Sequence, residues 1–475
     1  MKLYEQLSSD IQQRIETGFY QSNQKLPSIR DMSTEQNVSI STVQEAYRLL
    51  EDSGFAISKP KSGYYVKRPI HKIVLPDISQ PEQKPVEVKY WDEVLALTTS
   101  KTIAGFTAFG KGGPNTNLHT LKPLQRIHAS LVRQQPQQYL SNETGNGSYE
   151  LREQIARLML KSGCKIHPDD ILITTGCQEA LSLSLKALTK PGDIVAIDSP
   201  GFYGSVQAIH SNGLKALEIP THPEKGISLS ALEMALEQWP IKVIQLVPTV
   251  NNPTGYIMSD EKKKKLLELA TKYDIAIIED DINGELIYQN PRPRSIKSFD
   301  KDGRVLLCSS FSKTVAPGLR VGWVAAGRYG KILTHLKFIT SLASASLPQL
   351  AMAEFIVDGH YEKHLRHARH QGQHGRDCMI SWVQKYFPEG TKMTYPKGGF
   401  QLWVELPEQV DTLILNENLK PFKIGIAPGI LFSCSGKTKN CLRLNYAAEP
   451  TKHVEDCIKL IGEQAHLLLA DKTKD

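Results

Sequence analysis

A lysine that follows an apolar run is the first residue of this sequence whose setting suggests chemistry. Residues 305–308 are predicted to form a buried strand, and a turn of hydroxyls, Lys313, two backbone breakers and Arg320 follows it. A lysine in such a turn is often a solvated loop residue. The alternative is a lysine that forms a Schiff base with an aldehyde cofactor, while the hydroxyls and Arg320 hold a phosphate. The residues that follow the other predicted strands distinguish these two interpretations of Lys313.

Polar residues also follow three further apolar runs that are predicted to be strands. These are residues 171–174 before Gly176, 243–247 before Asn252 and 275–278 before Asp280. In a sheet covered by helices, ligands bind beyond the carboxyl ends of the strands, where all four sets lie. The turn at Gly176 opens a helix, whose free amides and positive dipole end suit a phosphate. An aspartate can keep a pyridine nitrogen protonated, as pyridoxal phosphate (PLP) chemistry requires, and an asparagine amide can donate to the ring's O3′ oxygen.

From about Trp91 to the C-terminus, these motifs resemble those of the fold type I PLP enzymes of the aminotransferase superfamily. The resemblance implies that Lys313 is the Schiff-base lysine and that Asp280 is the partner of the pyridine nitrogen, so these two are the expected catalytic residues. It implies that Arg443 grips the carboxylate of a substrate. In the same way, Phe202 would stack on the cofactor ring and Asn252 would meet O3′. The residues expected to form the phosphate cup are Cys177, Gln178, Ser310, Ser312 and Arg320.

One departure from this resemblance bears on activity. The related enzymes usually carry a tyrosine two or three residues after the aspartate, where its hydroxyl supports O3′. Ile282 and Asn283 occupy those positions here. Neither an aliphatic side chain nor a shorter amide reproduces the reach and acidity of a phenol. We therefore expect any transamination to be slow.

The first 68 residues predict a separate domain. Apolar residues repeat at helical spacing from Leu3 to Ile15, and two shorter helices are expected near residues 28–32 and 39–50. Two short helices with a tight turn between them form a helix-turn-helix, whose second helix can enter a major groove. The alternating segments 55–58 and 63–66 predict a basic hairpin suited to phosphates. A packing or dimerisation module is the other interpretation of such a unit.

The residues of this domain resemble the winged helix of GntR-type transcription regulators. The resemblance lies in Leu-Pro-Ser-x-Arg at 26–30, Val-Ser-x-Ser-Thr-Val at 38–43 and Ser-Gly-Tyr at 62–64. The regulators often have an arginine at the position of Ile40, and its loss would remove a phosphate or guanine contact. The resemblance implies that the residues facing double-stranded DNA are Arg30, Ser41, Thr42 and Gln44, with Gly63 at the tip of the wing.

Three parts of the chain are expected: residues 1–68, 69–90 and 91–475. The middle part contains four prolines among polar residues and is predicted to be a semi-extended linker. From residue 91 onward strand and helix alternate, which predicts an α/β domain with a seven-stranded, mostly parallel sheet and a smaller C-terminal lobe. A GntR-like head, a linker and an aminotransferase-like body together resemble the MocR-type regulators. That resemblance implies a homodimer formed through the body.

Composition sets only broad limits. The 475 residues exceed what one core usually covers, and the net charge of +7 permits a polyanionic partner. The seven cysteines lack paired Cys-x-x-Cys spacing, and neither a signal peptide nor a membrane-spanning apolar run is evident, so a cytoplasmic protein is expected. Five histidines between residues 360 and 374 have helical spacing, but interleaved arginines would repel a cation, so we predict no metal site.

Three functions fit these features. The first is a PLP-dependent transcription regulator that senses an amino acid, an amine or a vitamer. The second is an active aminotransferase that carries a DNA-binding head, which the retained Lys313, Asp280 and Arg443 favour. The third is a DNA-binding protein whose body is only a dimerisation scaffold, and the set of phosphate-binding residues argues against it. The sequence leaves the effector, the operator and the presence of enzymatic turnover open.

Overall fold

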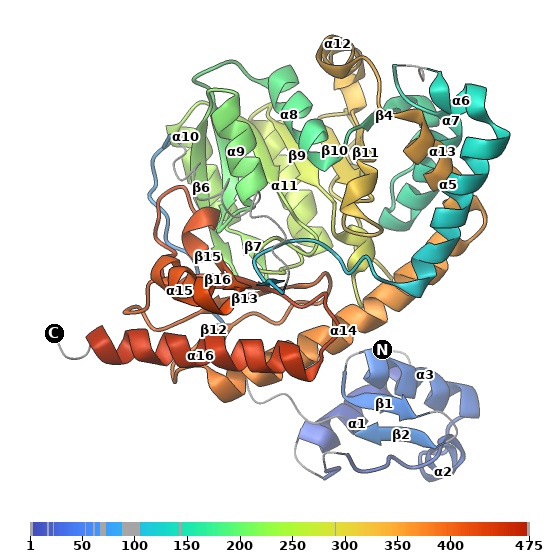
Figure 1. The fold of residues 1–475 in the computed structure, drawn as a ribbon, viewed down its shortest axis with the longest axis vertical. Helices are drawn as coiled ribbons and strands as arrows, with labels where there is room; N and C mark the ends of the chain where they lie inside the picture. The colour runs from blue at the N-terminus through green and yellow to red at the C-terminus, as the bar shows by residue number, and fades with distance from the viewer. Residues whose placement is uncertain are drawn as a thin grey trace. The chain divides into compact units, whose positions relative to one another are not determined.

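The computed structural model divides into two compact units, Met1–Lys72 and Ile73–Asp475, and each is described by itself (Figure 1). The residues that the structure describes are 3–16, 19–21, 23–52, 54–59, 62–66, 73–87, 105–141, 145–289 and 291–472.

The described residues of the first unit form three helices and a hairpin. The elements are α1 (Leu3–Glu16), α2 (Ile29–Glu35), α3 (Ile40–Asp52), β1 (Ala56–Lys59) and β2 (Gly63–Val66). The side chain of Ser28 caps α2 by accepting a hydrogen bond from Asp31 N at 3.2 Å, and Ser39 Oγ accepts one from Thr42 N at 3.1 Å at the start of α3. The two strands pair antiparallel. The predicted winged helix is confirmed.

One apolar core holds the first unit together. The repeat predicted in α1 supplies Leu7, Ile11 and Ile15, which are buried against apolar residues of α2, α3 and the hairpin. The tyrosine of α3, Tyr47, is also buried, and its hydroxyl donates to Pro27 O at 2.8 Å. This bond ties α3 to the segment before α2 and so fixes the angle of the helix-turn-helix.

A large mixed sheet forms the centre of the second unit. Its strand order is β4-β11-β10-β9-β8-β5-β6-β7. The strands are β4 (Ile171–Thr174), β5 (Ile194–Ser199), β6 (Lys215–His222), β7 (Gly226–Ile227), β8 (Ile241–Leu246), β9 (Ala276–Asp280), β10 (Val305–Ser310) and β11 (Gly322–Ala325). All seven predicted strands are present. The two-residue strand β7 adds an eighth in the described part of the chain, and it is too short to leave an alternating pattern in the sequence.

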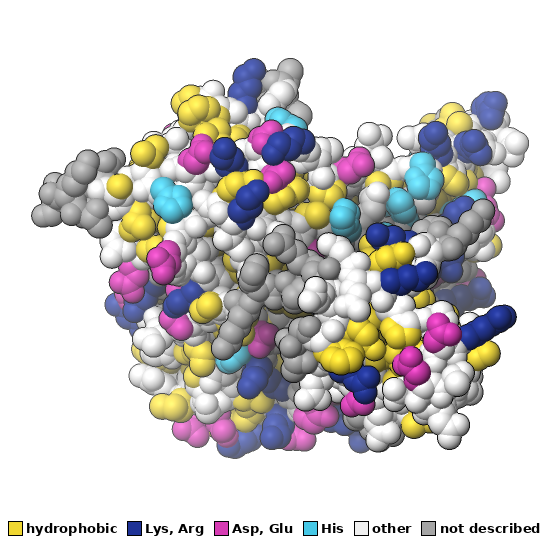
Figure 2. All heavy atoms as spheres, turned by 90° about the horizontal axis from the view of Figure 1, so that it is seen from below, with side chains coloured by type: hydrophobic (Ala, Val, Ile, Leu, Met, Phe, Trp, Pro, Cys, Tyr) yellow, Lys and Arg dark blue, Asp and Glu magenta, His cyan; other side chains and the backbone are white. Residues whose placement is uncertain are grey.

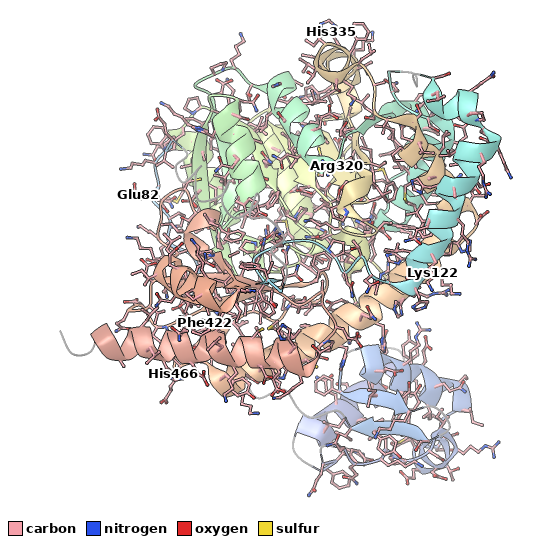
Figure 3. All side chains as sticks on the ribbon, in the orientation of Figure 1. Glu82, Lys122, Arg320, His335, Phe422 and His466 are labelled. Atoms are coloured by element: carbon pink, nitrogen blue, oxygen red, sulfur yellow. The ribbon has the colours of Figure 1, made fainter. Side chains whose placement is uncertain are left out.

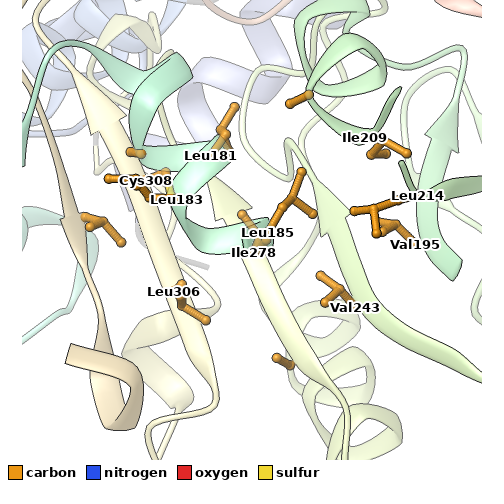
Figure 4. Packing of buried hydrophobic residues seen from close by; sticks show 14 of the residues in the cluster. Leu181, Leu183, Leu185, Val195, Ile209, Leu214, Val243, Ile278, Leu306 and Cys308 are labelled. Atoms are coloured by element: carbon orange, nitrogen blue, oxygen red, sulfur yellow. The ribbon is translucent and has the colours of Figure 1, made fainter. Parts of the chain in front are cut away.

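Helices bury both faces of this sheet. On one face, Leu181 and Leu185 of α8 (Cys177–Leu188) and Ile209 of α9 (Tyr203–Ser211) pack against Val195 and Ile278 (Figure 4). On the other face, α10 (Leu229–Gln238) and α11 (Asp260–Lys272) pack against the alternate residues of the same strands. Because both faces are covered, the strands read as continuous apolar runs in the sequence.

The described part of the second unit also contains further helices and a smaller sheet. The helices are α5 (Lys122–Gln134), α6 (Pro136–Leu140), α7 (Tyr149–Met159), α12 (Gly330–Ser341), α13 (Ser346–Val357), α14 (His360–Tyr386), α15 (Thr412–Leu419) and α16 (Lys452–Lys472). An antiparallel sheet of order β12-β13-β16-β15 forms the predicted C-terminal lobe. Its strands are β12 (Lys392–Met393), β13 (Gln401–Glu405), β15 (Ala427–Pro428) and β16 (Cys441–Asn445), and a further pair joins β14 (Ile424–Gly425) to β3 (Thr107–Ala108).

Residues 73–87, which lie within the predicted linker, are part of the second unit and pack against β6. Val86 and Ala216 exchange two backbone hydrogen bonds of 2.9 and 3.0 Å, and Thr221 N donates to Ser79 Oγ at 2.8 Å. The predicted linker boundaries at 69 and 90 lie outside the described residues, so they stay a prediction.

Two surface properties bear on function. Within the described part of the chain, no helix has both the length and the apolar character needed to cross a membrane. On the face shown in Figure 2, basic and acidic side chains are interspersed.

Candidate functional site

The strand order brings the predicted site residues to one edge of the central sheet. Asp280 ends β9 and Ser310 ends β10, and these two strands are parallel neighbours. Strand β11 runs antiparallel to both of its neighbours, so its beginning lies at the same edge. Arg320, which precedes β11, therefore reaches this edge from a strand of opposite direction (Figure 3).

Arg320 and the start of α8 form a cradle for an anion. Gly176 precedes α8 with a φ of 89°, and Arg320 Nη2 donates to Thr175 O at 2.6 Å. A Cβ on Gly176 would lie only 2.4 Å from Arg320 Nη2, so only glycine lets the guanidinium approach here. The first amides of a helix have no partner within the helix, and they add to the positive charge of Arg320.

The hydroxyls of the lysine turn lie buried beside this edge. Ser310 Oγ accepts a hydrogen bond from Ser312 N at 3.3 Å. Ser312 Oγ is buried and has no partner among the described residues. A buried hydroxyl without a partner is costly, and a phosphate oxygen would satisfy it. The cradle and this hydroxyl therefore fit a phosphate-bearing group.

Burial shifts the pKa values of the two expected catalytic residues in opposite directions. It lowers the pKa of Lys313 to about 8, helped by Arg443 and opposed by Asp280. It raises the pKa of Asp280 to about 6, against the hydrogen bonds from Ile282 N (3.1 Å) and Cys177 Sγ (3.5 Å). Lys313 Nζ donates to Gly112 O. A lysine of lowered pKa offers a free amine near neutral pH, and a buried carboxylate gains from a cationic partner.

Arg443 of β16 in the smaller sheet and Asn252, in the turn after β8 of the central sheet, meet directly. The Arg443 side chain is buried and donates through Nη1 to Asn252 Oδ1 at 3.0 Å and through Nη2 to Gly110 O at 2.5 Å. Its guanidinium lies 4.9 Å from the ring centroid of Phe432. Because Asn252 Oδ1 is already an acceptor, its amide nitrogen is left to donate to a second partner.

Phe202 and Gln178 both pack on Gly204. Gln178 Nε2 donates to Gly204 O at 2.8 Å, and a Cβ on Gly204 would lie 2.4 Å from the Phe202 ring. The side-chain amide of Gln178 thus donates to Gly204, and its backbone amide, in the first turn of α8, can donate to an anion.

Neither residue at the expected tyrosine position supplies a polar group to Lys313. Ile282 packs against the apolar cluster beneath α8, and Asn283 Nδ2 donates to Val250 O at 2.9 Å. The site therefore lacks the tyrosine hydroxyl that the related enzymes usually have, and neither Ile282 nor Asn283 replaces it.

Sequence reasoning missed the segment of Gly110 to Gly113. Its carbonyls accept hydrogen bonds from Lys313, from Arg443 and from Asn445, whose Nδ2 lies 2.6 Å from Lys111 O and 2.8 Å from Gly113 O. The three glycines before Pro114 were the only signal in the sequence for a close backbone approach.

His364 also escaped prediction, except as one of the five spaced histidines. It is buried, its Nε2 donates to Thr314 O at 2.8 Å, and its Nδ1 lies 2.8 Å from Thr120 Oγ1. Burial lowers the pKa of His364 to about 4, so the ring is neutral and braces the residue after Lys313. Across the described residues, no three His, Cys, Asp or Glu side chains gather in a way that could hold a metal ion.

The residues expected to face DNA lie on α2, α3 and the hairpin of the first unit. Arg30, Ser41, Gln44 and Gly63 are exposed, and Thr42 is half-buried. Ser39 Oγ lies 2.8 Å from both Ser41 Oγ and Thr42 Oγ1, so part of their hydrogen-bonding capacity is used within α3. Ile40 is 50% exposed at the start of α3 and offers an apolar contact where related regulators often offer an arginine.

Comparisons with known proteins match both units. The model of aminotransferase class I and II matches residues 109–461, and that of the bacterial regulatory proteins of the gntR family matches residues 3–66. An uncharacterized HTH-type transcriptional regulator, YjiR of Escherichia coli, is 47% identical over 466 residues, which cover 98% of this chain and 99% of that protein. The HTH-type transcriptional regulator NorG of Staphylococcus aureus is 26% identical over 91% of this chain and 98% of its own.

A solved structure resembles the second unit. The kynurenine aminotransferase of Pyrococcus horikoshii is 31% identical with a TM-score of 0.73, over 80% of this chain and 95% of that chain. The chain therefore belongs to the class I and II aminotransferase family and carries a gntR-family winged helix in front of that domain, which is the architecture of the MocR-type regulators.

Proposed function

We propose that this protein is a transcription regulator that binds double-stranded DNA through its first unit and senses an amino acid, an amine or a vitamer through PLP held in its second unit. The observation that carries the proposal is the presence, in one chain, of a winged helix and of a site that gathers Lys313, Asp280, Arg320 and Arg443. The regulator names of the full-length relatives support the first half.

Each part of PLP would have a partner in the site. The cradle of Arg320 and α8, with Ser310 and Ser312, would hold the phosphate. Asp280 would keep the pyridine nitrogen protonated, and Asn252 would donate to O3′. Phe202 would stack on the ring, and Lys313 Nζ is the amine that would bond to the aldehyde carbon.

When bound, PLP acts as an electron sink for an amine attached at its aldehyde carbon. The chain's own residues supply the rest. Lys313, with its pKa lowered to about 8, exchanges a proton near neutral pH. Arg443 would bind and orient the carboxylate of an amino acid. Lys313 is thus the group that an incoming amine would displace.

An active aminotransferase with a DNA-binding head is the second candidate. The favouring observation is that Lys313, Asp280 and Arg443 are all retained and lie close together, which mere ligand binding does not require. Ile282 and Asn283, which bring no phenol, favour the sensor instead.

We also propose a homodimer formed through the second unit. Large apolar side chains stand exposed on its helices, as an oligomer would bury: Leu140 on α6, Phe338 and Ile339 on α12, and Val357 on α13. Light scattering coupled to size-exclusion chromatography tests this directly. A monomeric mass at micromolar concentration would contradict it.

An absorbance titration tests the main proposal. Purified protein with PLP is titrated with a panel of amino acids, amines and vitamers, and then with a keto acid. A sensor shows a shifted cofactor band with one ligand and no turnover, and that ligand changes the affinity for DNA selected from random duplexes. Repeated bleaching and recovery with a keto acid would identify an aminotransferase. A Lys313→Ala variant that responds to the ligand like the wild type would contradict the sensing mechanism.

A further inference from the structure

We propose that Gln401 is a ligand-binding residue that shares the carboxylate of the sensed molecule with Arg443, so that the site selects amino acids over amines without a carboxylate. The inference rests on the proposed function, because it names the ligand class of the same site.

The register of the C-terminal sheet places Gln401 beside Arg443. Strands β13 and β16 pair antiparallel, with Gln401 opposite Asn445 and Trp403 opposite Arg443. Side chains alternate between the two faces of a strand, so these four residues share one face. Gln401 and Arg443 are diagonal neighbours on it, within reach of one ligand group.

That face is directed toward Lys313. Arg443 and Asn445 donate to the carbonyls of Gly110, Lys111 and Gly113, and Lys313 donates to Gly112 O between them. A Cβ placed on Gly112 would lie 3.1 Å from Gln401 Nε2, 3.4 Å from Lys313 Nζ and 3.5 Å from Arg443 Nη2. Three nitrogens on three separate elements therefore surround one point beside the Gly112 backbone.

The amide of Gln401 lacks a partner at this point. The side chain is only 6% exposed, and its Nε2 has no hydrogen-bond acceptor among the described residues. Arg443 Nε is also buried and has no hydrogen-bond acceptor among the described residues. Buried donors without acceptors are rare in folded proteins, and these two belong to diagonal neighbours on one face of the sheet, so they indicate a missing acceptor.

A carboxylate satisfies these donors best. It offers two oxygens with several acceptor sites, and Arg443 recognises it in a planar, two-bond geometry that leaves an oxygen for an amide such as that of Gln401. The nearby Lys313 Nζ marks where the amine of the ligand must arrive, so carboxylate and amine belong to one small molecule. The chemical class is therefore an amino acid.

The test compares amino acids with amines of the same side chain. The full-length, PLP-loaded protein is titrated with L-leucine against 3-methylbutylamine and with L-phenylalanine against 2-phenylethylamine. Dissociation constants come from the cofactor absorption band and, independently, from calorimetry. In the wild type we expect the amino acid of a responding pair to bind at least about tenfold more tightly than its amine, as for one hydrogen bond to a charged group.

Two variants isolate the role of Gln401. Gln401→Leu should weaken binding of the amino acid by about tenfold, because one hydrogen bond to a charged group is lost. It should change the dissociation constant of the amine by no more than about twofold. Gln401→Glu should weaken the amino acid further, since its carboxylate repels that of the ligand. The matched control is Gln245→Leu, which removes another buried strand glutamine whose amide lacks a partner in the described chain, and it should leave both constants unchanged.

The outcomes separate this inference from the proposed function. Equal losses for the amino acid and its amine in Gln401→Leu, or no loss for either, would overturn the role of Gln401 while the sensing function stands. If no amino acid or amine perturbs the wild-type cofactor band, the proposed function fails and the inference falls with it. Each variant must first show the wild-type cofactor spectrum without ligand, and Gln401→Asn replaces Gln401→Leu if the latter does not fold.

Discussion

Single residues determine the protonation states in the site. Asp280 ends a buried strand, and burial raises its pKa to about 6 in the free protein. A protonated pyridine nitrogen beside it would lower that pKa again, because opposite charges favour the ionised carboxylate. Deprotonation of Asp280 and binding of PLP therefore favour each other.

This linkage predicts the pH dependence of cofactor binding. Below about pH 6 the affinity for PLP should fall by up to about tenfold per pH unit, because protons then compete for the Asp280 carboxylate. Fluorescence titration with PLP between pH 5 and 8 measures this. Asp280→Asn should bind PLP more weakly at pH 7.5 and lose the dependence near pH 6. An unchanged profile in that variant would show that another group controls binding.

The absence of a tyrosine hydroxyl at the position of Ile282 is a second property of the site that depends on one residue. Ile282 packs against the apolar cluster beneath α8, so the position is shaped for a hydrocarbon. Ile282→Tyr should raise the rate of transamination between an amino acid and a keto acid by about tenfold or more, because the added hydroxyl would support O3′ with one hydrogen bond to a charged group. The added ring should cost about 1–3 kcal/mol of stability through overpacking. Stopped-flow absorbance and thermal unfolding measure the two effects. A wild type that already turns over at an ordinary aminotransferase rate would refute the premise.

At the scale of elements, the junction of Gly176, α8 and Arg320 is the most constrained part of the site. Gly176 has a φ of 89°, and a Cβ there would lie 2.4 Å from Arg320 Nη2. Gly176→Ala should therefore displace Arg320 and weaken PLP binding by at least tenfold, in addition to a backbone cost of about 1–3 kcal/mol.

Gly192→Ala is the matched control for this change. Gly192 has a similar φ of 92°, but nothing lies within 4 Å of a Cβ added there. The control should also lose stability, because an alanine is strained at this φ too, and it should keep the affinity for PLP. Thermal unfolding without PLP and titration with PLP separate the two effects. Equal PLP affinity in both variants would mean that Arg320 does not hold the phosphate.

Whether a part of the site can be predicted from the sequence depends on the element that carries it. The seven long strands and their polar ends follow local rules, so both were predicted from apolar runs and the residues after them. Strand β7 has only two residues and leaves no pattern. Gln401 enters the site through its pairing with β16, more than forty residues later, and the Gly110–Gly113 segment through hydrogen bonds to Lys313 and Arg443. Such contacts depend on the assembled sheets, which local periodicity does not encode.

At the scale of the whole molecule, the proposed function requires that ligand binding to the second unit and DNA binding to the first unit are thermodynamically coupled. A ligand can shift DNA affinity only if its own affinity differs between the DNA-bound and DNA-free protein. Thermodynamic linkage makes the effect reciprocal, so DNA must change the ligand affinity by the same factor. Residues 73–87 belong to the second unit, so they are not a free tether between the winged helix and the aminotransferase-like domain.

This reciprocity is a strict test of the regulator. If the ligand changes the dissociation constant for the selected duplex by five- to 150-fold, the range of about 1–3 kcal/mol found for allosteric coupling, the duplex must change the ligand's constant equally. Fluorescence anisotropy measures the first constant, and the cofactor absorption band measures the second. Lys313→Ala should keep the DNA affinity of the ligand-free protein and lose the coupling, because Lys313 is the group that the ligand would displace. Ligand-independent DNA binding by a PLP-loaded wild type would leave the aminotransferase as the better description.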